Sequence, residues 1–266
     1  MTRRTLIGIV WVYFVVLLIG PIAYLCADAF REGAGRFWEE ITRPEALHAF
    51  LLTAQITAIV LIVNLVAGTA TALVLARQHF PGKTMLGGLI DLPFAVSPVI
   101  AGFMLILLFG PETLLGAFFG TLDVKILFAF PAMVLATLFV TFPFVVRELT
   151  PVLQIVGIEG EEAARTLGAS EWQVFFRVTL PSVKWGMVYG ATLTVARAIG
   201  EFGAILVVAG NVLGMTQTAT LHIYQSYVDF NYVGAYAVAA TLLAVSFAIL
   251  IILEVARARA VVTTVQ

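Results

Sequence analysis

The chain is poor in cysteine and in charged residues. Its one cysteine, Cys26, excludes an intramolecular disulfide and any metal site built from several cysteines. Only 12% of the 266 residues are charged and the formal net charge is −1, so the excess of lysine and arginine that nucleic-acid binding requires is missing. Neither a disulfide scaffold nor a nucleic-acid partner is therefore expected.

A phosphate-binding loop is also missing. An ATP site of the P-loop type needs the pattern G-x-x-x-x-G-K-[ST], whose backbone N–H groups hold the phosphates. Gly82-Lys83-Thr84 matches only the end of this pattern, because Arg77 stands where the first glycine is needed and Pro81 supplies no N–H. We expect a chain that binds no cofactor, does not hydrolyse ATP by itself and is not an enzyme.

Apolar residues are abundant. They make up 61% of the chain, and the mean hydropathy is +1.02, which is more apolar surface than a soluble domain of this length can bury. Six stretches are long enough to cross a bilayer, which takes about 20 residues each. They are Leu6–Ala27, Phe50–Ala76, Leu86–Phe109, Leu127–Val146, Val188–Ala209 and Ala235–Val255. The expected fold is all-α: one integral membrane domain, residues 1–266, with six transmembrane helices.

Prolines are expected to break or kink two of these helices. Pro93 and Pro98 lie in the third predicted span, and Pro131 and Pro143 lie in the fourth. Membrane helices tolerate proline where neighbouring groups satisfy the freed carbonyls. Such kinks suit either a pathway that opens and closes or simple packing.

The positive charges between the spans indicate the orientation. Lysine and arginine are enriched in cytoplasmic loops of membrane proteins. With the N-terminus inside, the cytoplasmic segments carry Arg3, Arg4, Arg77, Lys83, Arg147, Arg165, Arg177, Lys184, Arg257 and Arg259, and the outer segments carry Arg31, Arg36, Arg43 and Lys125. We therefore expect both chain ends and a long loop, about residues 149–184, in the cytoplasm.

The long cytoplasmic loop has the features of two short helices joined by a turn. Glutamates cluster at residues 159–162, where they favour the positive end of a helix dipole. Gly168 can adopt the left-handed conformation that ends a helix, and Ser170 with Gln173 forms the pattern of a capping box. On these features alone, the loop either docks a partner or only caps its own helical bundle.

The spacing within this loop resembles the EAA loop of ABC-importer permeases. The match comprises Glu162-Ala163-Ala164, Gly168 and Leu180-Pro181, with Val178 where isoleucine is more usual. The resemblance implies a helix-turn-helix coupling loop that grips a separate cytoplasmic ATPase, which would bind the ATP and Mg. The docking residues that it implies are Glu161, Glu162, Ala163, Ala164, Gly168, Ser170, Trp172, Leu180 and Pro181.

Two charged residues lie inside the fifth predicted span. Arg197 and Glu201 are four residues apart, hence on one face of a helix, and each costs about 2.5–3.5 kcal/mol at that depth unless paired or hydrated. They either lock neighbouring helices together or line a pathway in which Arg197 meets an anion. Gly200 and Gly203 allow another backbone to approach closely. The candidate pathway residues are Arg197, Gly200, Glu201, Phe202 and Gly203.

The same segment carries a second resemblance. Residues 197–204, RAIGEFGA, resemble the R-x-x-G-E-F-G-A segment of oxyanion ABC permeases, the sulfate and molybdate group. Residues 90–99, IDLPFAVSPV, resemble the third span of that group. The stretch from Val208 to Tyr232 is most similar to its sulfate/thiosulfate permease subunit.

These resemblances imply a permease for sulfate or thiosulfate in the inner membrane of a bacterium, surrounded by lipid. Its partners would be a second, related permease subunit that is a different chain, two cytoplasmic ATPase subunits and a periplasmic sulfate-binding protein. A molybdate or tungstate permease is the alternative within the class. A secondary transporter driven by an ion gradient is the alternative from another class.

Overall fold

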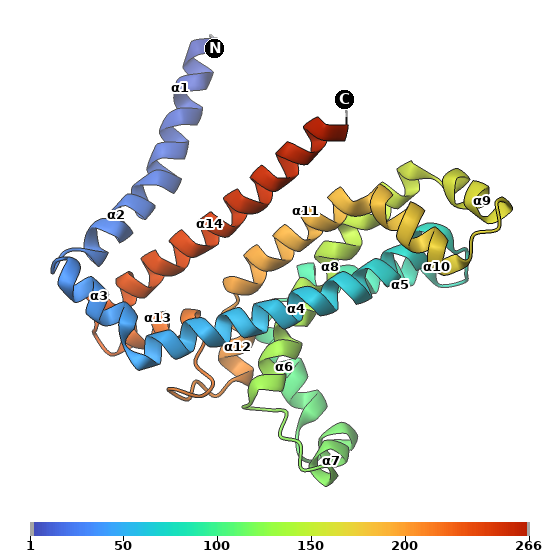
Figure 1. Ribbon diagram of the computed structural model, residues 1–266. Coiled ribbons are helices and arrows are strands. Elements are labelled where there is room, and N and C mark those ends of the chain that lie inside the picture. Colours follow the sequence, from blue (N-terminus) through green and yellow to red (C-terminus); the bar gives the residue numbers. More distant parts are fainter. Residues whose placement is uncertain (1–2, 265–266) are drawn as a thin grey trace. The chain divides into compact units, whose positions relative to one another are not determined.

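The computed structural model describes residues 3–264, and in this part of the chain all regular secondary structure is helical (Figure 1). The elements are α1 (Arg3–Phe14), η1 (Val15–Ile19), α2 (Gly20–Ala29), α3 (Ala34–Thr42), α4 (Pro44–Arg77), α5 (Lys83–Ala95), α6 (Pro98–Phe109), α7 (Leu114–Thr121), α8 (Phe130–Val156), α9 (Glu159–Thr166), α10 (Glu171–Val174), η2 (Phe175–Thr179), α11 (Leu180–Ile199), α12 (Gly203–Val208), α13 (Ala219–Val228) and α14 (Tyr232–Thr264). The segments η1 and η2 are π-helical. The two chain ends, expected in the cytoplasm, lie outside the described residues.

Four continuous helical stretches are long and apolar enough to cross a membrane. They are Arg3–Ala29, Pro44–Arg77, Phe130–Val156 and Tyr232–Val255. They contain most of the first, second, fourth and sixth predicted spans. The all-helical membrane class is confirmed.

The third predicted span is not straight. Its two halves, α5 and α6, are bent by 114° at a break of two residues. The break directly precedes Pro98, which has no N–H to donate and pushes Ser97 into an extended conformation (φ −60°, ψ 137°). The expected break in this span is confirmed, whereas the fourth span runs as one helix through Pro143 and has Pro131 in its first turn.

The fifth predicted span is also interrupted. Helix α11 ends at Ile199, α12 begins at Gly203, and residues 200–202 between them are not helical. Of the six predicted spans, four are continuous helices and the bent pair α5 with α6 would be a fifth; α11 with α12, the remaining predicted span, is not among the described stretches that are long and apolar enough to cross a membrane. Arg197 and Glu201 lie on either side of the end of α11.

By packing, the chain divides into two compact units. One comprises residues 53–211 and 248–266, and the other comprises residues 1–52 and 212–247. In the first, α4, α8 and α11 meet around Val145, which is fully buried. A Cβ added at Gly68 would lie 2.8 Å from Val145 Cβ, and one added at Gly190 would lie 3.1 Å from Val145 Cα. Small residues thus bring these three helices together, as is usual in membranes.

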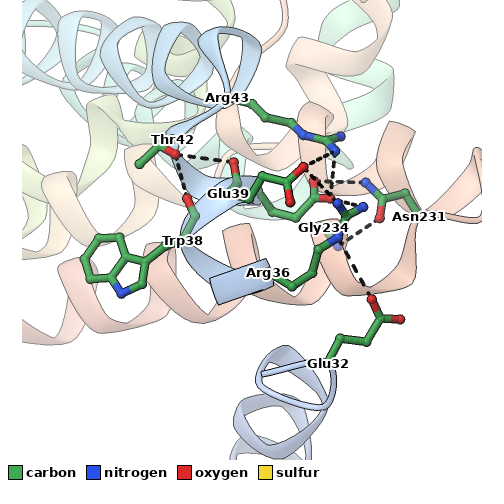
Figure 2. Close-up of polar contacts among 9 residues, drawn as sticks. Glu32, Arg36, Trp38, Glu39, Thr42, Arg43, Asn231 and Gly234 are labelled. Carbon is green, nitrogen blue, oxygen red and sulfur yellow. Dashed lines mark hydrogen bonds and ion pairs between the residues drawn. The ribbon is translucent and has the colours of Figure 1, made fainter. Parts of the chain in front are cut away.

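The other unit contains a charged network around Glu40, a residue of α3 that is only 3% exposed. Arg36 Nη2 and Arg43 Nη2 lie 2.7 and 3.1 Å from Glu40 Oε1. Asn231, directly before α14, donates from Nδ2 to Glu40 Oε2 at 3.1 Å. Figure 2 shows these side chains converging. The network ties α3 to the beginning of α14.

The close helix contact at Gly68 can be tested by thermal unfolding in detergent. Gly68→Ala is expected to lower the free energy of unfolding by about 1–3 kcal/mol, because the new methyl group overpacks against Val145. The control is Gly88→Ala in α5, where an added Cβ meets nothing within 4 Å. Alanine favours a helix over glycine by about 1 kcal/mol, so the control should lose no stability. Equal losses in both variants would contradict the contact.

Candidate functional site

The predicted coupling loop has the expected helix-turn-helix form. Gly168 ends the turn after α9 with φ +86°, a value that side chains rarely adopt. Ser170 and Gln173 form the expected capping box: the Ser170 N–H donates to Gln173 Oε1 at 2.9 Å, and the Gln173 N–H donates to Ser170 Oγ at 3.4 Å. Local chemistry therefore places α9 and α10 on either side of a defined turn.

Arg165 joins the two helices on either side of this turn by pairing with Glu171. Arg165 Nε lies 2.8 Å from Glu171 Oε1, and Arg165 Nη2 lies 3.0 Å from Glu171 Oε2. This two-point contact fixes both the distance and the orientation between α9 and α10. The hydrogen bond from Arg165 and its positive charge lower the pKa of Glu171, so the contact persists at neutral pH.

A second arginine anchors the loop to α4. Arg77 Nη2 lies 3.0 Å from Glu161 Oε1, which also accepts from Thr179 Oγ1 at 3.1 Å. Arg77 also donates to the Leu153 carbonyl at 2.8 Å and the Gly157 carbonyl at 2.5 Å. Glu161 is only 8% exposed, so it holds the loop in place from within and presents no surface to a partner. The sequence analysis did not predict this contact of Arg77.

The other predicted docking residues lie mostly at the surface. Glu162, Ala163, Gly168, Ser170, Trp172 and Pro181 are exposed, and Ala164 and Leu180 are partly buried. Trp172 is 74% exposed and its ring stacks on Phe176 at a centroid distance of 5.8 Å. Leu167, which the motif did not single out, is 89% exposed. Large apolar side chains exposed beside a carboxylate are typical of a protein interface.

The coupling loop is continuous with the fifth span. Helix α10 leads through η2 into α11 without a non-helical break, so residues 171–199 form one continuous helical segment. Within it, the Leu180 N–H donates to the Phe175 carbonyl, the wider spacing of a π-helix. Pro181 follows directly and has no N–H for the ladder. Pro181, expected to begin a helix, does lie in the first turn of α11, but this helix continues from the loop.

At its other end, this helical segment contains Arg197 and leads into the other predicted pathway residues. Arg197 Nη1 lies 2.7 Å from Glu201 Oε2, and the Glu201 side chain is fully buried whereas that of Arg197 is 31% exposed. Glu201 Oε1 accepts from the Ala204 N–H at 2.9 Å. Glu201 thus pairs with the Arg197 guanidinium and also accepts from the Ala204 N–H, which has no partner within α12 because it lies at the start of that helix. The sequence predicted the pair but not this second bond.

The two interrupted spans meet at their breaks (Figure 1). A Cβ added at Gly203 would lie 3.1 Å from Pro98 Cβ, and one added at Gly102 would lie 2.9 Å from the Ala204 carbonyl oxygen. The expected close approach is therefore present at Gly203. An added Cβ at Gly200 would have no neighbour nearer than 3.8 Å, so Gly200 is not needed for packing. Phe202, between them, is partly buried. Non-helical backbone at membrane depth is found where protein covers it or where it lines an aqueous cavity.

The comparisons with known proteins agree with this geometry. The sulfate transport system permease protein CysW of Synechococcus elongatus is 44% identical over 254 residues, which are 96% of this chain and 89% of that protein. The sulfate transport system permease protein CysT of Escherichia coli K12 is 35% identical over 253 residues, 95% of this chain and 91% of that protein. The resemblance to the oxyanion group of ABC permeases is confirmed.

The fold matches a solved transporter as well. A bacterial ABC transporter involved in the import of the acidic polysaccharide alginate contains a chain that aligns with a TM-score of 0.78 and 17% identity, covering 96% of this chain and 94% of that one. At this identity the match shows the fold alone. Residues 64–261 match the family described as "Binding-protein-dependent transport system inner membrane component". The chain therefore belongs to the family of inner membrane components of binding-protein-dependent transport systems.

Proposed function

We propose that this chain is the permease subunit of an ATP-driven importer that carries sulfate or thiosulfate across the inner membrane of a bacterium. The observation that carries the proposal is the continuous helical segment of residues 171–199, which begins in the coupling loop and ends beside the Arg197–Glu201 pair. The similarity to CysW and CysT supports the choice of anion.

The coupling loop is proposed as the docking site of the ATPase. Its exposed side chains, above all Glu162 and Trp172, would enter a groove of that subunit, while the buried contact between Arg77 and Glu161 holds the loop against α4. ATP and Mg would bind on the ATPase. Movement of the loop would then be transmitted along α11, because no flexible linker separates them.

The pathway is proposed to pass Arg197, Gly200, Glu201, Phe202 and Gly203. Arg197 would offer a fixed, always charged guanidinium to a passing dianion. Glu201 would keep this contact weak by opposing the anion, which favours release. Such a permease needs only a transient site, since the binding protein supplies the affinity.

The proposed assembly contains a second permease subunit, two cytoplasmic ATPase subunits and a periplasmic sulfate-binding protein. The similarity to both CysW and CysT suggests that the two permeases are different, related chains. Within the assembly, residues 1–266 would act as one permease domain with both ends in the cytoplasm.

Uptake into proteoliposomes tests this function. The reconstituted complex should import labelled sulfate only when ATP and the loaded binding protein are supplied, and an ionophore that collapses ion gradients should have no effect. Import of molybdate in place of sulfate would keep the mechanism and change the substrate. Import that survives without the ATPase but stops with the ionophore would replace the proposal with a secondary transporter.

Docking can be tested with a charge reversal on the loop. Glu162→Lys is expected to abolish co-purification of the ATPase while leaving the permease in the membrane, because Glu162 is exposed. Glu112→Lys makes the same change at an exposed glutamate on the predicted outer side and should retain the ATPase. Undiminished co-purification of Glu162→Lys would remove this residue from the docking surface.

Anion passage can be tested at Arg197. The Arg197→Ala variant should assemble with the ATPase but lose at least nine-tenths of sulfate uptake, because one charge-assisted contact is worth about 1.4 kcal/mol or more, a factor of ten. Uptake and co-purification are measured on the same preparation. Near-normal uptake with a lowered Tm would show that the pair only locks helices together.

A further inference from the structure

A second arginine–carboxylate pair joins α5 to α8: Asp91 lies in the third predicted span, and Arg147 directly follows the fourth. Arg147 Nε donates to Asp91 Oδ1 at 2.5 Å, and Arg147 Nη2 contacts Asp91 Oδ2. The guanidinium also lies over the Phe94 ring, 5.8 Å from its centroid, where the ring face attracts a cation. Phe144, on the preceding turn of α8, meets Phe94 edge-on at 5.4 Å. Asp91 and these rings therefore fix the guanidinium in one orientation.

The position of this pair is unusual for an arginine that only marks the cytoplasmic side. Arg147 belongs to the apolar helix Phe130–Val156, and Asp91 lies about 12 Å along α5 from Lys83. The Arg147 side chain is nevertheless 56% exposed, and that of Asp91 is 35% exposed. Charged side chains exposed on a membrane-spanning helix are expensive in lipid and are expected to face water or a bundle interior. An arginine whose only role is to reach the membrane surface would not require an aspartate partner in the third predicted span.

The pair also lies on the cytoplasmic side of Arg197. The next residue of α8, Glu148, faces α11: its Cβ is 3.7 Å from a Cβ added at Gly190. Arg197 lies seven residues beyond Gly190, which is about 10 Å further along α11 and away from the coupling loop. The two pairs are thus staggered along the direction in which an imported anion would travel.

We propose that Arg147 is a second anion-contacting residue of the pathway, positioned by Asp91 and Phe94 and reached after Arg197; this inference rests on the proposed function. The bonds to Asp91 use Nε and Nη2, which are on one side of the guanidinium, and leave the donors of Nη1 for an oxyanion. Asp91 would oppose a dianion, so the contact would be brief. Two weak, staggered contacts would let the anion advance without being trapped at either.

In the opposing interpretation, the ion pair between Arg147 and Asp91 only holds α5 and α8 together. Three variants in the complete complex separate the interpretations, with sulfate uptake and co-purification of the ATPase as readouts. Arg147→Gln removes the cation, and the paired change Asp91→Leu with Arg147→Met replaces the ion pair by apolar contacts, which often preserve stability. Arg147→Lys keeps the charge but not the two-point geometry.

We expect both cation-free variants to assemble and to lose at least nine-tenths of uptake, with Arg147→Lys between them and the wild type. If the paired change Asp91→Leu with Arg147→Met retained wild-type uptake, the ion pair would only hold α5 and α8 together. This result would overturn the proposal even if Arg147→Gln failed to assemble. Failure of the proposed function is seen separately, because the wild-type complex would then import no sulfate. If the wild-type complex imports another oxyanion in place of sulfate, uptake by the variants is compared with wild-type uptake for that anion.

Discussion

The hydrocarbon core offers no hydrogen-bond partner, so every polar group within it must find one inside the protein. This constraint accounts for the arrangement of the irregular parts. The helix breaks before Pro98 and after Ile199 pack against one another at Gly203. Glu201 pairs with Arg197 and also accepts from the Ala204 N–H, so one buried carboxylate satisfies both the charge and the new helix start. The breaks and the charges thus form one connected region.

The same region is joined to the coupling loop by a continuous helical segment. A movement of α10 would be passed to α11 through the continuous helical segment of residues 171–199, whose π-helical turn directly precedes the turn that contains Pro181. Arg77 of α4 binds Glu161 and the carbonyls at the end of α8, and Glu161 also accepts from Thr179. These contacts hold the helical segment of residues 171–199 against α4 and α8. In the proposed importer, this connection would give a physical route from movement of the loop to the Arg197–Glu201 pair.

Much of this arrangement was predictable because it depends on short-range chemistry. Hydropathy identified the long helices, and the positions of Gly168, Ser170 and Gln173 predicted the turn and its capping box. The contacts of Arg77 and Arg147 were missed because their partners lie 84 and 56 residues away in the sequence. A signal was present at Asp91, since an acid within an apolar span implies a partner. The placement of Glu161 inside the loop also depends on packing against α4, which no local pattern reveals.

The most direct test of this account is the ATPase activity of the reconstituted complex with the binding protein loaded in turn with sulfate, thiosulfate or molybdate. The account predicts stimulation by the sulfate-loaded or thiosulfate-loaded protein and none by the molybdate-loaded one. Stimulation by molybdate alone would contradict the assigned substrate. A chain with which no ATPase associates would contradict the role of the coupling loop and, with it, the proposed source of energy.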